Sequence, residues 1–258
     1  MILKEFRYSL LTEEDIQGRE IREVKLTKTQ EEVCRRIVSV AKFFFKGGYN
    51  LQEVPFRGFL LEGPPGSGKT EIAKQAVRRL DLELGNVYLR FVDSAKIAKP
   101  RWGEAEEALA QQFREEPGKH IILLLDDVDC LLIRRGSEVA KEWHYSINAL
   151  LFHELDNIED PANLLVIATT NRPKLVDYAL RSRLYSIRVS LPSLEELELV
   201  IRDMIEKWPF WIESFDEELK EDIIKAIIGE LKKKKNPSIR DVQNLVITQC
   251  IERGVWKI

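Results

Sequence analysis

The feature that most constrains the fold is a glycine-rich stretch in the N-terminal third of the chain, Gly63-Pro64-Pro65-Gly66-Ser67-Gly68-Lys69-Thr70. It lies between the apolar run 59–61 and a helix-like segment that begins at Glu71. Glycines permit backbone conformations closed to other residues, so successive N–H groups can converge on an anion at the N-terminus of the following helix. The stretch fits the pattern G-x-x-x-x-G-K-[ST] and predicts a phosphate-binding loop in an α/β fold.

Each polar residue at the end of this loop has an expected role. Lys69 would reach the outer phosphates of a nucleotide, and Thr70 would ligate Mg²⁺. Glu71 opens the helix whose first turn would hold the anion. The alternative is a Gly/Pro loop that carries an unrelated lysine, but the strand-like run before it and the helix-like run after it favour phosphate binding.

Strand-like and helix-like segments alternate up to residue 191. Apolar runs predict strands at 56–62, 87–92, 121–125, 164–168 and 186–191. Amphipathic segments predict helices at 27–45, 71–80, 104–115 and 138–155, the first opened by a capping box of Thr27 and Gln30. This alternation predicts a parallel sheet covered by helices on both faces.

From Pro192 onward the pattern is helical only. Three capping pairs predict the starts of three helices: Ser193 with Glu196, Ser214 with Glu217, and Ser238 with Asp241. We therefore expect two domains, an α/β domain with an N-terminal extension over residues 1–191 and a small all-helical domain over 192–258.

Composition narrows the classes of protein to consider. The 258 residues carry 40 basic and 43 acidic side chains, a net charge of −3, so no global field draws the chain to nucleic acid or an anionic membrane. No apolar run approaches the roughly 18 residues of a membrane span, and the N-terminus lacks a signal-peptide layout. Three widely spaced cysteines without C-x-x-C spacing fit a reducing compartment. We expect a soluble, cytoplasmic protein that is not inserted in a membrane.

Two adjacent carboxylates, Asp126 and Asp127, follow the unbroken aliphatic run 121–125. This is the pattern of a buried parallel strand with its ligand-facing end at the carboxylates. Asp126 would hold Mg²⁺ together with Thr70, and Asp127 would orient or deprotonate an attacking water. The alternative is that both carboxylates cap the following helix or lie in solvent.

Five motifs in order resemble those of the AAA+ ATPases, and within them the AAA clade. They are Walker A at 63–70, a pore loop with G-E-x-E at 102–106, Walker B at 121–129, sensor 1 at 168–173 and an arginine-finger segment at 177–184. The resemblance implies a P-loop NTPase αβα sandwich with a parallel sheet, followed by a small helical lid. It also implies ATP and Mg²⁺ as cofactors and assembly into a ring, usually a hexamer.

The resemblance assigns further residues. Asn171 would hydrogen-bond the water or the γ-phosphate, the alternative being a plain turn residue. Arg183 would reach the γ-phosphate bound in the neighbouring subunit, with Arg181 as a second candidate and a solvated surface arginine as the alternative. Arg240 stands at the position that resembles sensor 2, although many members of the AAA clade lack an arginine there. A cation in the first turn of a helix opposes the helix dipole, which favours a role at the nucleotide. The alternative is a plain surface arginine.

Two further positions depart from the family pattern. Asp127 stands where glutamate is usual, which shortens the reach to the water by one methylene and predicts slow turnover or an extra water. In the expected pore loop, Arg101-Trp102-Gly103, arginine takes the usual place of an aromatic and Trp102 directly precedes the glycine. Trp102 could grip peptide or stack a base, or it could belong to the core or a subunit contact.

The sequence thus predicts an ATP-hydrolysing ring motor that remodels or threads a protein. The alternative is a nucleic-acid-associated ATPase such as an initiator, helicase loader or viral replication factor, motivated by Arg240, Ser182-Arg183-Leu184 and the lysine run 232–235. That run also fits a solvated helix end, where cations favour the dipole. A third hypothesis is an ATP-switched scaffold without catalysis, motivated by Asp127.

Overall fold

A computed structural model describes residues 15–47, 56–93, 104–130, 142–207 and 216–255. The chain divides into two compact units. The first contains Met1–Glu23, Val33–Gly63 and Lys69–Arg188. The second contains Val24–Glu32, Pro64–Gly68 and Val189–Ile258, so two short segments from the N-terminal half of the chain belong with the C-terminal helices.

The first unit is built on a six-stranded sheet with the order β1-β3-β4-β5-β2-β6. The strands are β1 (Ile16–Gln17), β2 (Gly58–Glu62), β3 (Val87–Asp93), β4 (His120–Asp126), β5 (Leu164–Thr170) and β6 (Tyr185–Arg188). All neighbouring strands are parallel except β1 and β3. Residues 164–170 are buried throughout, as expected for a central parallel strand with both faces covered.

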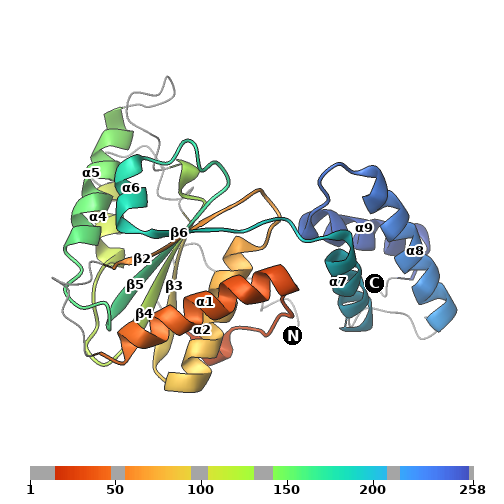
Figure 1. Ribbon diagram of the computed structural model, residues 1–258, viewed down its shortest axis with the longest axis horizontal. Helices are drawn as coiled ribbons and strands as arrows, with labels where there is room; N and C mark the ends of the chain where they lie inside the picture. Colours follow the sequence, from red (N-terminus) through yellow and green to blue (C-terminus); the bar gives the residue numbers. More distant parts are fainter. Residues whose placement is uncertain (1–14, 48–55, 94–103, 131–141, 208–215, 256–258) are drawn as a thin grey trace. The chain divides into compact units, whose positions relative to one another are not determined.

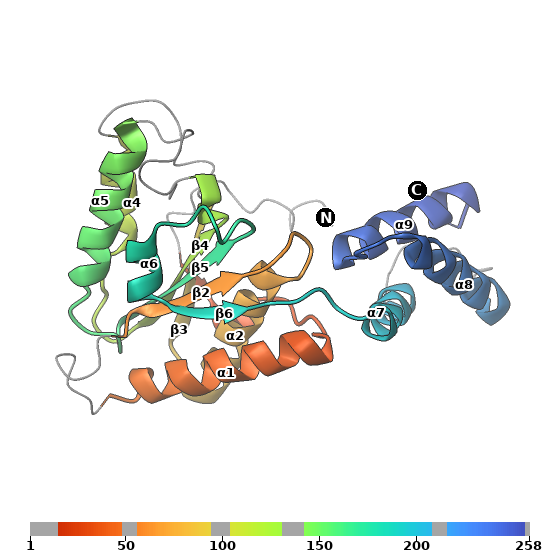
Figure 2. The same ribbon diagram turned by 45° about the horizontal axis from the view of Figure 1, so that its top comes forward.

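Helices cover both faces of this sheet (Figures 1 and 2). On one face lie α1 (Lys28–Phe45) and α2 (Lys69–Leu84). On the other lie α4 (Glu104–Gln112), α5 (Glu142–Asp156) and α6 (Tyr178–Arg183). The predicted α/β fold with a sandwiched, mainly parallel sheet is therefore confirmed.

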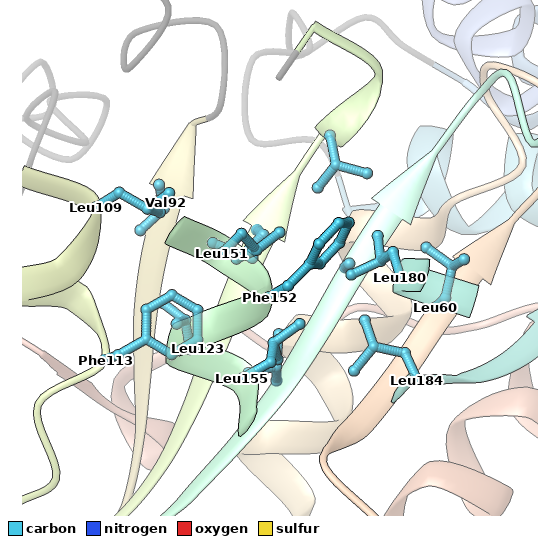
Figure 3. Close-up of a cluster of buried hydrophobic side chains, with 14 of the residues drawn as sticks. Leu60, Val92, Leu109, Phe113, Leu123, Leu151, Phe152, Leu155, Leu180 and Leu184 are labelled. Carbon is cyan, nitrogen blue, oxygen red and sulfur yellow. The ribbon is translucent and has the colours of Figure 1, made fainter. Parts of the chain in front are cut away.

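The core under α4, α5 and α6 is a continuous apolar cluster (Figure 3). Leu123 of β4 and Leu60 of β2 are fully buried, and Phe152 of α5 packs among the leucines of the neighbouring elements. Burying a leucine or phenylalanine side chain contributes about 1.5–3 kcal/mol each. This cluster holds the strands in register and so sets where their carboxyl ends lie.

The edge strand β1 was not predicted. It pairs antiparallel with β3, Ile16 opposite Leu89, and so breaks the expected all-parallel pattern at one edge. An ion pair anchors this segment: Arg90 donates to both carboxylate oxygens of Asp15, at 2.8 and 2.7 Å, and also to Glu116. A two-residue strand has no periodicity to detect, so only these tertiary contacts define it.

The second unit contains the helices α7 (Leu194–Lys207), α8 (Glu217–Lys233) and α9 (Ile239–Glu252). Their apolar faces form a separate core that includes Ile201, Ile227 and Val246, all fully buried. The capping boxes of Ser193 with Glu196 and of Ser238 with Asp241 both form, as the sequence predicts.

The predicted cap of α8 was wrong. Asp216, and not Ser214, caps this helix: its carboxylate accepts from the N–H of Leu219 at 2.9 Å. Ser214 itself lies outside the described residues. Aspartate and serine are comparable caps, so the choice between two nearby candidates depends on where the preceding chain turns.

Candidate nucleotide site

The glycine-rich loop contains two residues in left-handed backbone conformations. Gly66 has a φ of 77° and Gly68 a φ of 87°, which other residues rarely adopt. At its start, the N–H of Gly63 donates to the carbonyl of Thr170 at the end of β5, at 3.2 Å. The loop runs directly into α2, which begins at Lys69, so the backbone reaches a helix N-terminus in the way an anion site requires.

Lys69 is buried, with 6% of its surface exposed. Its Nζ donates to the carbonyl of Gly63 at 2.9 Å and to Oδ1 of Asn171 at 2.7 Å. A buried ammonium needs such acceptors, because its charge loses the stabilisation of water. The lysine side chain is therefore held at the carboxyl ends of β2 and β5, next to the predicted sensor residue.

The two predicted magnesium ligands lie together. Oγ1 of Thr70 donates to Oδ1 of Asp126 at 2.7 Å, and Oγ1 of Thr169 donates to the same oxygen, also at 2.7 Å. Hydroxyl and carboxylate oxygens are the hard ligands that Mg²⁺ prefers. The donor set of Thr70 and Asp126 thus fits a magnesium ion.

Asp127 leaves the strand in a left-handed conformation, with a φ of 52°. Its N–H donates to Oγ1 of Thr169 at 2.9 Å, and its Oδ1 accepts from Nδ2 of Asn171 at 2.6 Å. Asn171 therefore bridges Lys69 and Asp127 through the two ends of its side-chain amide. Aspartate tolerates positive φ better than most residues, and here the residue lies exposed at the end of β4.

The two predicted arginines contact carboxylates of their own chain. Arg183 donates to both carboxylate oxygens of Asp156, at 2.8 and 2.7 Å, and lies over the ring of Phe152. Arg181 forms an ion pair with Glu62 at the end of β2, at 2.8 Å. The hydrogen bonds from Arg183, acting against desolvation, lower the pKa of Asp156 below its ordinary value.

In the second unit, Arg240 lies near the glycine-rich loop. It is exposed in the first turn of α9, and a methyl group on Gly66 would lie 3.5 Å from its Cβ. The preceding residue, Ile239, donates its N–H to the carbonyl of Gly66 at 3.2 Å. The N-terminus of α9 thus contacts the loop directly.

Residues 59–191, just over half of the chain, match the ATPase family associated with various cellular activities (AAA). This chain belongs to the AAA ATPase family.

Two curated relatives of this AAA ATPase are bacterial proteins named "AAA ATPase forming ring-shaped complexes". That of Corynebacterium kroppenstedtii is 30% identical over 71% of this chain and 34% of its own length. That of Bifidobacterium adolescentis is 32% identical over 81% of this chain and 40% of its own length. The chain thus spans well under half the length of these relatives.

A solved structure has the same fold. A chain of the E. coli MS115-1 HORMA:CdnC:Trip13 complex superposes with a TM-score of 0.61, covering 86% of this AAA ATPase and 88% of that chain. The sequence identity is 16%, so the likeness concerns the fold alone.

One residue that the sequence reasoning did not single out organises the sensor turn of this AAA ATPase. The carboxylate of Asp129 accepts from the hydroxyl of Thr170, from the N–H of Asn171 at 2.9 Å and from the N–H of Arg172 at 3.4 Å. The predicted strand 164–168 is longer in the structure, since Thr169 and Thr170 also belong to β5, and the turn of the sensor 1 segment follows Thr170. The sequence signal that could have identified Asp129 is its place as the third aspartate in Asp126-Asp127-Val128-Asp129.

Other predicted positions are less informative. Glu71 lies in the first turn of α2, where its carboxylate accepts from Nε2 of Gln75 at 2.8 Å. The expected pore-loop residues Arg101, Trp102 and Gly103 lie outside the described residues. In the part of the chain that the structure describes, none of the helices is long and apolar enough to cross a membrane.

Proposed function

We propose that this AAA ATPase binds and hydrolyses ATP as a ring of identical subunits, six in the family's usual arrangement. The observation that carries the proposal is the hydrogen-bonded series Lys69–Asn171–Asp127 beside the pair Thr70–Asp126. These are the side chains that phosphate binding and water activation need, and they gather at the carboxyl ends of parallel strands, where α/β folds bind ligands.

Each side chain has a role in this proposal. Lys69 and the loop N–H groups bind the β- and γ-phosphates, and Arg240 contributes a further positive charge. Asn171 and Asp127 orient the attacking water, and Asp127 accepts its proton. Thr70 and Asp126 would hold Mg²⁺, which neutralises charge that develops on the phosphate oxygens.

Arg183 of a second copy would supply charge stabilisation in trans, with Arg181 as a second candidate. The names of the bacterial relatives describe ATPases that form ring-shaped complexes, and this supports the proposed ring. Ring formation brings together the site of one subunit and the arginine segment of the next. An isolated subunit should then hydrolyse ATP slowly.

We infer further that the ring remodels or threads a protein substrate in the cytoplasm. The expected pore loop with Trp102 motivates the choice of substrate, and three widely spaced cysteines without C-x-x-C spacing suit a reducing compartment. The lysine run offers the nucleic-acid alternative little support, because Lys233 forms an ion pair with Glu230 and Lys234 with Asp241.

The test is steady-state ATPase activity alone and with an unfolded polypeptide, single-stranded DNA or duplex DNA, with Lys69→Ala as the inactive control. The oligomeric state is measured in parallel with and without ATP. Stimulation by the polypeptide alone supports protein remodelling, and stimulation by DNA alone supports the nucleic-acid alternative. No turnover in an assembled ring would favour the ATP-switched scaffold.

A further inference from the structure

Gln30 in the first turn of α1 has two separate hydrogen-bonding partners. Its Oε1 accepts from the N–H of Thr27 at 3.0 Å, which completes the capping box predicted from the sequence. Its Nε2 donates to the carbonyl of Ser67 in the glycine-rich loop, at 2.9 Å. Only 2% of Gln30 is exposed. One amide thus caps a helix and reaches a loop 37 residues further along the chain.

The contact with Ser67 fixes the orientation of a peptide group in the loop. In a trans peptide the C=O and the following N–H point in opposite directions. Because Nε2 of Gln30 holds the carbonyl of Ser67 toward α1, the N–H of Gly68 points away from α1. The fit is close: a methyl group on Gly68 would lie 2.2 Å from Nε2 of Gln30.

Other carbonyls of the loop are also bound by donors. That of Gly63 accepts from Nζ of Lys69, that of Pro64 from the N–H of Ser67, and that of Gly66 from the N–H of Ile239. A carbonyl oxygen carries a negative partial charge and would repel a phosphate. Among these four carbonyl contacts of the loop, only that of Ser67 involves a donor on a side chain from outside the loop, the side chain of Gln30.

We propose that Gln30 is a positioning residue for phosphate binding. It does not touch the nucleotide; it turns the Ser67–Gly68 peptide so that the carbonyl faces α1 and the N–H is available to a phosphate oxygen. This role rests on the proposed nucleotide binding. It also assigns a second task to the first turn of α1, beyond starting the helix.

Three variants separate the two tasks of Gln30. Gln30→Met keeps the length of the side chain and loses both hydrogen bonds. Gln30→Glu keeps an acceptor for the N–H of Thr27 and has no donor for the carbonyl of Ser67. Thr27→Ala is the matched control: it removes the hydroxyl that accepts from the N–H of Gln30 at 3.4 Å, on the side of the capping box away from the loop.

The measurement is the dissociation constant for ADP and for ATP with Mg²⁺, using a fluorescent analogue and competition, together with KM, kcat and the thermal unfolding midpoint. Both Gln30 variants should weaken binding of either nucleotide about tenfold, the effect expected when a buried carbonyl loses its donor. KM for ATP should rise, and kcat should stay within about twofold of the wild-type value, because the loop binds the ground state and the transition state alike. Thr27→Ala should lower the midpoint and leave binding unchanged.

Wild-type affinity in Gln30→Met would overturn the inference and leave the proposed function standing. Equal weakening by Thr27→Ala would also overturn it, because the loss would then follow from the stability of α1. If the wild-type chain binds neither nucleotide, the proposed function itself fails.

Discussion

The carboxyl ends of the central strands and the short helix α6 both belong to the first unit, and both carry residues assigned to ATP hydrolysis. At the strand ends, Lys69, Asn171 and Asp127 hydrogen-bond to one another. In α6, Arg183 and Arg181 bind the carboxylates of Asp156 and Glu62, which have no assigned role in the reaction.

The difference indicates which part of the machinery one chain can complete. The strand-end residues are already in mutual contact within one chain. If Arg183 serves a neighbouring subunit as proposed, it first has to leave Asp156. The comparison predicts different effects for substitutions in the two regions.

The largest effect is expected from Arg183→Ala. Loss of an arginine that acts in trans should lower kcat by about a thousandfold or more, while nucleotide binding by the subunit stays intact. Steady-state ATPase assays and ADP titration of the assembled protein measure both. Arg114→Ala, which removes an exposed guanidinium, is the control. Retention of a tenth of the activity would contradict a role in trans.

Asp127→Asn should lower kcat at least a hundredfold, since asparagine cannot accept the proton of the attacking water. Asparagine tolerates the left-handed backbone at this position as aspartate does and keeps an acceptor for Asn171, so ADP affinity should be unchanged. Single-turnover hydrolysis and ADP titration test the pair of outcomes. If Asp127→Asn hydrolyses ATP with the wild-type kcat, Asp127 does not accept the proton and has only a structural role.

A smaller effect is expected for Asp129→Asn, about tenfold in kcat. One carboxylate oxygen of Asp129 becomes an NH₂ group, which cannot accept the hydrogen bonds that the carboxylate accepts in the wild type. The turn that carries Asn171 would therefore be displaced. KM for ATP should change less than kcat. The comparison variant is Asp160→Asn, an exposed carboxylate in the segment before β5. If both variants behave alike, Asp129 does not position the sensor turn.

The smallest effect is expected for Asp156→Asn. The Asp156 side chain is 55% exposed, so its ion pair with Arg183 contributes no more than about 1 kcal/mol to stability. Because the folded pKa of Asp156 lies below its ordinary 3.8, this contribution is present above that pH and is lost as the pH falls through the folded pKa. The unfolding midpoints of the wild type and of Asp156→Asn, measured from pH 7 to pH 3, should converge in acid. A constant gap would exclude the ionised pair as the cause.

Local patterns allowed much of the fold and several site positions to be predicted. The apolar runs became β2 to β6, and the capping pairs at Thr27, Ser193 and Ser238 formed. Capping and strand burial depend on residues close together in the chain, so a single sequence contains the information. The loop conformations at Gly66 and Gly68 follow from glycine chemistry in the same way.

Tertiary structure decided the rest. The antiparallel strand β1, the carboxylate of Asp129 under the sensor turn and the bond from Gln30 to Ser67 all join segments far apart in the sequence. The sequence identified Gln30 only as half of a capping box, because a side-chain amide has a second hydrogen-bonding end whose partner is set by packing. Sequence by itself determined that β2 to β6 and the helices form, and which residue types stand at most of their ends. Only the folded chain determined which of those ends meet, since hydrogen bonds between distant residues depend on geometry that no local pattern encodes.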